Sequence, residues 1–135
     1  MVRCVIVTQT QWTAVDRYIS DLFVPSDPAL DALPRIEAEQ IGPFDFTFID
    51  ADKESYPQYL TWAMKLSRPG SVIVADNIVR EGQVVDAGSR DTNVQGVRRF
   101  NAKLAAETRV VATAFQVVGS KGYDGFAIAV VAGED

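Results

Sequence analysis

Two apolar segments, each ending in an aspartate, enclose one segment with helical spacing, and this arrangement constrains the fold more than any other feature. Phe44–Ile49 is a β-prone run that ends at Asp50, and residues 71–75 form a second such run that ends at Asp76. Between them, residues 56–67 repeat apolar side chains at intervals of three and four. A strand, a helix and a strand in this order form a βαβ unit with parallel strands and a right-handed crossover. The sequence therefore predicts an α/β fold.

Regular elements are also expected after this unit. The Arg-Pro-Gly triplet at residues 68–70 is typical of the end of a helix. A polar loop, a helix and two strands are then expected, in this order, over residues 80–93, 94–107, 110–118 and 126–131. Residues 119–125 connect the last two strands through turn residues and contain no helix, which predicts an antiparallel pair at the end of the sheet.

The N-terminal part differs in pattern from the rest of the chain. Residues 10–23 have helical spacing, and Asp27 before Pro28 is typical of the start of another helix. Leu33-Pro34 predicts a break before a short amphipathic piece over residues 35–40. We therefore expect one domain over residues 1–135, with a helical region at 1–32 and the sheet at 33–131.

Composition excludes several function classes. The chain has no histidine and a single cysteine, Cys4, which excludes Ser-His-Asp and Cys-His catalysis, histidine-containing zinc sites and an intramolecular disulfide framework. Thirteen Lys and Arg residues against 18 Asp and Glu residues give a net charge of −5, which argues against nucleic-acid and anionic membrane partners. No apolar run is long enough to span a membrane and no secretory signal is recognisable, so a soluble cytoplasmic protein is expected.

Acidic and amide residues follow both strands of the βαβ unit. Asp50 follows the first strand, and Asp76 and Asn77 follow the second. Because parallel neighbouring strands end at one edge of a sheet, these oxygen donors are expected to converge and would suit a hard cation such as Mg²⁺. Lys53 lies three residues after Asp50, where it is a candidate general base. The alternative interpretation is that the aspartates only cap helices and form turns.

Longer segments around these residues resemble a known family, the metal-dependent class I O-methyltransferases of the catechol and caffeoyl-CoA branch. The segments that carry the resemblance are residues 44–53, Tyr56, Tyr59, residues 66–77, Gly82 and residues 96–101. The resemblance covers residues 33–131, and residues 10–32 resemble the N-terminal helices of bacterial members. It implies a Rossmann-like doubly wound sheet, mostly parallel with an antiparallel C-terminal strand.

The resemblance also implies a reaction and roles for individual residues. It makes Asp50, Asp76 and Asn77 the ligands of a divalent metal, with magnesium as the expected ion, and Lys53 the general base. Asp50 and Asp52 fall where the family contacts S-adenosylmethionine, and Glu81 falls at a position that faces the acceptor in relatives. The implied function is methyl transfer from S-adenosylmethionine to a hydroxyl of a small catechol-like or phenolic acceptor.

One part of the family pattern is absent from this sequence. No strand before Phe44 is followed by a glycine-rich turn, so about three βα units are missing, and the gap falls between Ala32 and Leu33. The remaining half sheet would have an open edge, which residues 2–8 or a second chain would cover, so a homo-oligomer, most simply a dimer, is expected. Two alternatives stay open: a catalytically inactive remnant that acts by self-association or partner binding, and a response-regulator-like module, which the positions of the aspartates fit less well.

Overall fold

The computed structural model describes residues 10–11, 14–15, 18, 29–120 and 122–133. The chain consists of two compact units, Met1–Ala32 and Leu33–Asp135. Within the helix predicted over residues 10–23, the described positions are helical. The strand expected from residues 2–8 and the helix start at Asp27-Pro28 lie outside the described residues, and so does Cys4.

Helical segments and strands alternate along residues 29–119, and the last two strands follow each other directly. The helical elements are α2 (Ala29–Ala38), the 3₁₀ turn η1 (Lys53–Ser55), α3 (Tyr56–Lys65), the 3₁₀ segment η2 (Arg80–Val85) and α4 (Thr92–Ala106). The strands are β1 (Phe44–Ile49), β2 (Ser67–Asp76), β3 (Val110–Gly119) and β4 (Gly122–Val131). None of the helices among the described residues is long and apolar enough to cross a membrane.

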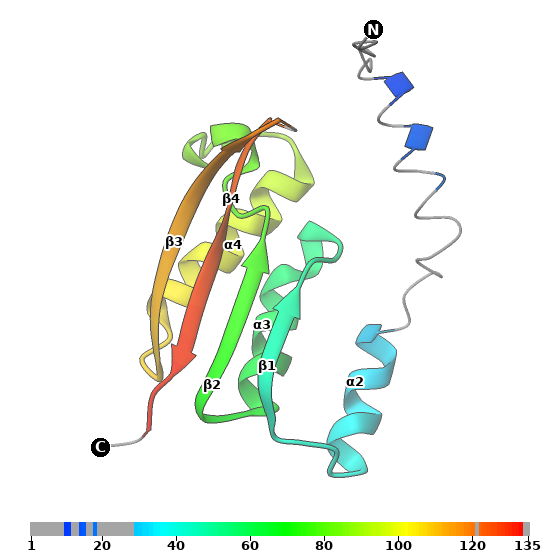
Figure 1. Cartoon of the computed structure of the whole chain (residues 1–135), viewed down its shortest axis with the longest axis vertical. Coiled ribbons are helices and arrows are strands. Elements are labelled where there is room, and N and C mark those ends of the chain that lie inside the picture. The colour runs from blue at the N-terminus through cyan, green and yellow to red at the C-terminus, as the bar shows by residue number, and fades with distance from the viewer. Residues whose placement is uncertain (1–9, 12–13, 16–17, 19–28, 121, 134–135) are drawn as a thin grey trace, which may run out of the picture. The chain divides into compact units, whose positions relative to one another are not determined.

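The four strands form one sheet in the order β1-β2-β4-β3 (Figure 1). β1 and β2 pair in parallel, and β4 pairs antiparallel with both β2 and β3. Strands β1, β2 and β3 therefore share one direction, and the C-terminal strand runs against them. The prediction of a mostly parallel α/β sheet with an antiparallel C-terminal strand is confirmed.

Three predicted boundaries are wrong. β2 begins at Ser67 because Ser67 already pairs with Phe44, so the Arg-Pro-Gly triplet lies within an irregular strand start and does not form a turn before it. The connection between β3 and β4 does not fill residues 119–125, because Gly119 pairs directly with Gly122 in a tight hairpin. α2 continues through Pro34, whose side chain is exposed, and an ion pair of 2.8 Å between Arg35 and Glu39 spans the turn that follows.

Helices α3 and α4 lie on the same face of the sheet (Figure 1). On this covered face, alternate residues of the strands pack into the core with apolar residues of the two helices. The fully buried members with the largest side chains are Tyr56, Leu60, Ile73, Val97 and Phe100. On the other side of the sheet, most of the alternating residues are also apolar but remain exposed or half-buried, and the polar positions in this alternation are Asp76, Thr113 and Asp124. We call this surface the open face; its residues are Phe46, Phe48, Val72, Val74, Val111, Phe115, Val117, Phe126, Ile128 and Val130.

Candidate active site at the carboxyl ends of β1 and β2

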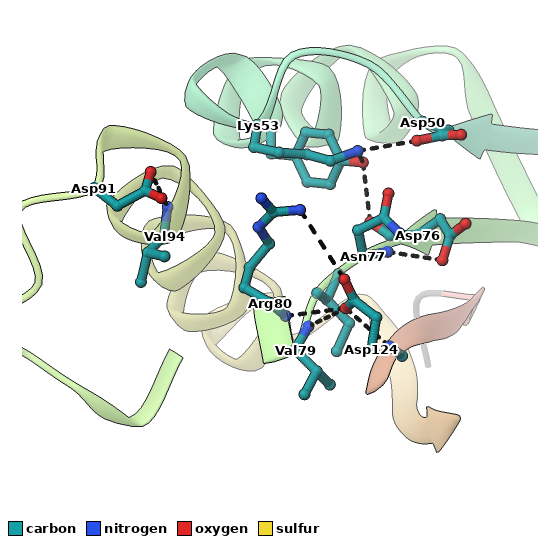
Figure 2. A network of polar contacts seen from close by, with 12 residues as sticks. Asp50, Lys53, Asp76, Asn77, Val79, Arg80, Asp91, Val94 and Asp124 are labelled. Carbon is teal, nitrogen blue, oxygen red and sulfur yellow. Dashed lines mark hydrogen bonds and ion pairs between the residues drawn. The ribbon is translucent and has the colours of Figure 1, made fainter. Parts of the chain in front are cut away.

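The polar residues predicted to converge lie at one edge of the sheet. Ile49 is paired with Ala75 in the parallel register, so Asp50 and Asp76 follow at neighbouring positions. Asn77 comes next, with a φ of 56°, a left-handed conformation that asparagine adopts more readily than most residues. Figure 2 shows Asp50, Asp76, Asn77 and Lys53 grouped around the same space. The structure therefore brings together the residues that the sequence indicates for a metal and a base.

Lys53 is held in a fixed position by two polar partners. Its Nζ donates hydrogen bonds to Asp50 Oδ1 at 2.9 Å and to the Tyr56 hydroxyl oxygen at 2.6 Å. The Lys53 side chain is only 12% exposed, whereas that of Asp50 is 47% exposed. The ammonium group also lies 4.7 Å from the centre of the Tyr56 ring. A side chain with four flexible bonds is thus confined to one place, at the boundary between the core and solvent.

Tyr56 connects the two strand ends to Lys53. Its hydroxyl donates to the carbonyl oxygen of Asp76 at 2.9 Å and lies 3.3 Å from the carbonyl oxygen of Ile49. Burial, with a smaller contribution from the charge of Asp50, raises the pKa of Tyr56. The hydroxyl therefore keeps its proton for the carbonyl and offers a lone pair to Lys53. In the sequence, Tyr56 stands out only as part of the family motif; its spacing of three from Lys53 is the signal that indicates the contact.

Gly96 determines how closely α4 approaches the Lys53 segment. A Cβ atom at this position would lie 2.2 Å from the carbonyl oxygen of Lys53 and 2.7 Å from Cα of Glu54. Only a residue without a side chain allows this contact between α4 and η1. The sequence places Gly96 in a longer motif but gives it no role, because nothing local distinguishes a contact glycine within a helix.

Asp52 caps the short turn that carries Lys53. Its carboxylate accepts hydrogen bonds from the backbone N–H of Ser55 at 3.1 Å and from the Tyr59 hydroxyl at 2.8 Å. Burial raises the pKa of Asp52, but the hydrogen bonds from Ser55 and Tyr59 outweigh burial, so the pKa lies below its usual value. The residue is therefore a carboxylate at neutral pH. Its predicted contact with the methyl donor remains a prediction.

The loop after β2 is held by an aspartate from β4. Arg80 and Glu81 have φ values of 52° and 54°, in the left-handed region that is unfavourable for these residues. Asp124 accepts hydrogen bonds from the backbone N–H groups of Val79 at 3.0 Å and Arg80 at 2.9 Å, and its other oxygen lies 4.0 Å from the Arg80 guanidinium (Figure 2). Asp124 is not among the predicted site residues, because its partners are more than 40 residues away in the chain.

A cavity of about 390 Å³ opens beside the ends of β2 and β4. Asp76, Asn77 and Glu81 line it together with the aromatic residues Tyr123 and Phe126. Asp50 and Lys53 are not among its lining residues. The cavity therefore joins two of the three predicted metal ligands to Glu81, the residue predicted to face an acceptor.

The donor set at this edge fits a hard divalent cation. Within residues 29–120 and 122–133, together with the few described positions before them, no group of three or more His, Cys, Asp or Glu side chains is placed to hold a metal. A metal here would depend on the carboxylates of Asp50 and Asp76 and the amide of Asn77. Oxygen-only ligation by few protein groups is typical of Mg²⁺, which retains several water molecules.

The sequence profile of the O-methyltransferase family matches residues 7–127. The chain belongs to the O-methyltransferase family. Two similar curated proteins are the catechol O-methyltransferases of Niastella koreensis, 53% identical over 112 residues, and of Mycobacterium tuberculosis, 47% identical over 104 residues. These alignments cover 83% and 77% of this chain but 51% and 46% of the relatives. This member of the O-methyltransferase family thus spans about half the length of the curated relatives it matches.

Solved structures give the same result. An O-methyltransferase from Bacillus cereus in complex with SAH is 64% identical and superposes with a TM-score of 0.74, covering 76% of this chain and 47% of that one. An O-methyltransferase from Streptomyces achromogenes, solved with SAM, is 53% identical at a TM-score of 0.74 and covers 78% of this chain and 47% of that one. The Rossmann-like fold predicted from the sequence is confirmed, and it corresponds to about half of an O-methyltransferase.

Proposed function

We propose that this chain carries the metal-binding and acceptor-binding half of an O-methyltransferase and transfers a methyl group from S-adenosylmethionine to a hydroxyl of a small catechol-like or phenolic acceptor. The observation that supports this most is the placement of Lys53 Nζ between Asp50 and Tyr56 at the paired strand ends. The names of the relatives support the acceptor class, since two of them are catechol O-methyltransferases. The bound SAH and SAM named for two structural neighbours support the methyl donor.

In the proposed reaction, Lys53 is the base. In its neutral amine form, Lys53 accepts the proton of the acceptor hydroxyl on Nζ and becomes an ammonium group, and the resulting oxygen anion attacks the methyl carbon of S-adenosylmethionine in line with the bond to sulfur. The carbon–oxygen bond forms as the carbon–sulfur bond breaks, and S-adenosylhomocysteine leaves. Asp50 and Tyr56 act on Lys53 by holding its Nζ in one position.

The remaining residues bind and orient the reactants. Asp50, Asp76 and Asn77 would hold the divalent metal, most simply magnesium, and a bound metal would stabilise negative charge on the acceptor oxygen. Asp50 and Asp52 are proposed to contact the methyl donor, with Asp52 fixed by its hydrogen bond from Tyr59. Glu81 lies on the cavity beside Asp76 and Asn77 and is proposed to face the acceptor.

Titration calorimetry with S-adenosylmethionine, in the presence and absence of MgCl₂, tests whether the donor binds. Methylation of catechol, followed by mass spectrometry, then tests the reaction. We expect Lys53→Met to lower kcat about 10²- to 10⁴-fold with a smaller effect on acceptor KM, because only proton transfer is removed. Lys65→Met is the matched control, since Lys65 is an exposed lysine on α3 whose ion pair is with Glu37. Equal losses in both variants would contradict the role of Lys53.

The second candidate function is that of a catalytically inactive remnant that acts by self-association or partner binding. This chain aligns with only about half of each relative. The other half of those enzymes has no counterpart in the alignment, and this favours the inactive remnant. A folded sample that gives no heat with S-adenosylmethionine and no methylated catechol would support this candidate. Detectable turnover that depends on Lys53 would exclude it.

A further inference from the structure

We propose that Asp124, on β4, is a positioning residue that fixes the conformation of the loop over residues 77–82 and thereby sets the affinity for the divalent metal. This inference rests on the proposed function, because Asn77, one of the proposed metal ligands, is the first residue of the loop. The backbone is left-handed at three loop residues other than glycine, Asn77, Arg80 and Glu81, with φ values of 56°, 52° and 54°. Such conformations are unfavourable for most residues and persist where the surrounding contacts determine them.

One carboxylate oxygen of Asp124 binds the backbone of this loop at two successive residues. Asp124 Oδ1 accepts hydrogen bonds from the N–H groups of Val79 at 3.0 Å and Arg80 at 2.9 Å (Figure 2). The same oxygen accepts a hydrogen bond from the N–H of Gly125 at 2.9 Å, which fixes the Asp124 side chain against its own strand. Two successive N–H groups that point at one fixed oxygen restrict the backbone where the left-handed turn begins.

Two further contacts hold Ile78, which follows Asn77 and precedes the residues bound by the carboxylate. The Ile78 N–H donates to the carbonyl oxygen of Gly125 at 3.0 Å, and its carbonyl oxygen accepts a hydrogen bond from Asn101 Nδ2 at 3.1 Å. Gly125 also permits the close approach of the loop to β4, because a Cβ atom there would lie 2.7 Å from Cγ2 of Val79. The loop is therefore held by β4 and by α4 together.

The segment over residues 78–80 lies between the two loop residues that line the cavity. Asn77 precedes this segment and Glu81 follows it, and both line the cavity of about 390 Å³ together with Asp76. Asp76 Oδ1 accepts a hydrogen bond from the N–H of Asn77 at 2.7 Å, so a movement of the loop backbone would reach both proposed metal ligands. Residues that orient metal ligands typically contribute about 10- to 100-fold to metal affinity.

Two substitutions separate this positioning role from a simple effect of charge. Any nearby carboxylate attracts a cation, although the Arg80 guanidinium, 4.0 Å from Asp124 Oδ2, offsets part of this charge. Asp124→Asn and Asp124→Ala remove the same charge, but the amide oxygen of asparagine still accepts hydrogen bonds from the loop N–H groups. We therefore expect the Kd of Mn²⁺ to rise at least about 10-fold in Asp124→Ala and less than about 3-fold in Asp124→Asn.

Titration calorimetry of the full chain with MnCl₂, without methyl donor or acceptor, measures these affinities. Asp91→Ala is the matched control, because Asp91 also accepts hydrogen bonds from two backbone N–H groups, those of Asn93 and Val94 at the start of α4. Asp91 is not among the proposed site residues, so its substitution should change the Kd by less than about 2-fold. Circular dichroism verifies that each variant is folded.

Amide hydrogen exchange, followed by NMR without any metal, gives a second readout of the loop itself. The amides of Val79 and Arg80 should exchange at least about 10-fold faster in Asp124→Ala than in the wild type, because they lose their acceptor. Asp124→Asn should restore most of their protection. Unchanged exchange at both amides in Asp124→Ala would overturn the positioning role.

The binding results distinguish this inference from the proposed function. Equal Mn²⁺ affinity in the wild type and Asp124→Ala would overturn the positioning role and leave the metal site intact. Equal losses in Asp124→Ala and Asp124→Asn would overturn it in favour of charge alone, and an equal loss in Asp91→Ala would overturn it in favour of a general effect on the fold. A wild-type chain that binds no Mn²⁺ would overturn the metal site itself and this inference with it.

Discussion

The two faces of the sheet are built from the same four strands and are similarly apolar, yet they lie in opposite environments. On the covered face, Ile73 is 2% exposed and Ala129 is 1% exposed, whereas Phe46 on the open face is 60% exposed. Alternation along each strand places neighbours in the sequence on opposite faces. Strand composition alone therefore specifies a sheet that is buried on both sides, and the helices of the described chain supply cover for one side only.

The largest difference between the faces is expected from the same substitution made on each side. Phe100, on α4, is fully buried and its ring meets Tyr56 edge-on with centres 5.5 Å apart. Phe100→Ala should lower the free energy of unfolding by about 3–5 kcal/mol, because it leaves a cavity in the core. Phe46→Ala should change it by less than about 1 kcal/mol, measured by urea denaturation at a concentration where the chain is monomeric. Similar losses in both variants would mean that the open face is covered in solution.

A smaller effect is expected at a close backbone contact on the covered side, where α4 meets the Lys53 segment. Gly96→Ala gains helix propensity of about 1 kcal/mol, but the new Cβ would collide with the backbone of Lys53. Because backbone atoms move less readily than side chains, overpacking should prevail and lower the free energy of unfolding by about 2 kcal/mol. Gly119→Ala is the control for the unfolding measurement, since a Cβ there meets no atom within 4 Å. Urea denaturation of both variants checks the prediction, and an unchanged free energy of unfolding for Gly96→Ala would contradict it.

Two tyrosines near the site also differ in burial: Tyr56 is fully buried, whereas the hydroxyl of Tyr59 contacts Asp52 in an exposed position. Tyr56→Phe removes the hydroxyl that contacts Lys53 and the carbonyl of Asp76, and should cost about 1–2 kcal/mol because the half-buried carbonyl loses its donor. Tyr59→Phe removes a hydroxyl whose contact with Asp52 is exposed, and should cost less than about 0.5 kcal/mol. Thermal unfolding of the two variants measures both values. A larger loss for Tyr59→Phe would contradict the anchoring role of Tyr56.

The smallest effect is expected at an ion pair that belongs to neither face. Hydrogen bonds from Arg109 lower the pKa of Glu107 from 4.5 to about 2. A lowered pKa gives stability that is complete above pH 4.5 and is lost as the pH falls towards 2. The contribution should be below about 1 kcal/mol, since solvent screens the pair. The difference in free energy of unfolding between the wild type and Glu107→Gln should therefore shrink between pH 4.5 and pH 2; a constant difference would contradict this assignment.

Most of the fold could be predicted because it depends on local patterns. The apolar runs of β1 and β2 and the helical spacing of α3 and α4 identify the βαβ order, and the short last connection identifies the antiparallel strand. The start of β2 could not be predicted, because Arg68-Pro69-Gly70 has turn chemistry and joins the strand only through the pairing of Ser67 with Phe44. Long-range pairing there prevails over local propensity.

The candidate site could be predicted only in the residues that follow strands. Asp50, Asp76 and Asn77 are identified by their place after apolar runs, and Lys53 by its spacing from Asp50. Asp124 and Gly96 could not be identified in this way. Asp124 acts on backbone groups more than 40 residues earlier in the chain, and Gly96 matters through a contact between separate helical elements. The roles of such positioning residues depend on contacts between segments far apart in the sequence, so only the tertiary structure reveals them.

The position of β4 also has a consequence for synthesis. This strand is the last of the described sheet in chain order, yet it lies between β2 and β3. During translation, the pairing edge of β2 stays unoccupied until residues up to Val131 have left the ribosome, so the sheet closes only after all four strands have been made. Nascent chains therefore pass through a stage with an unpaired inner strand, during which chaperones or neighbouring nascent chains have access to that edge.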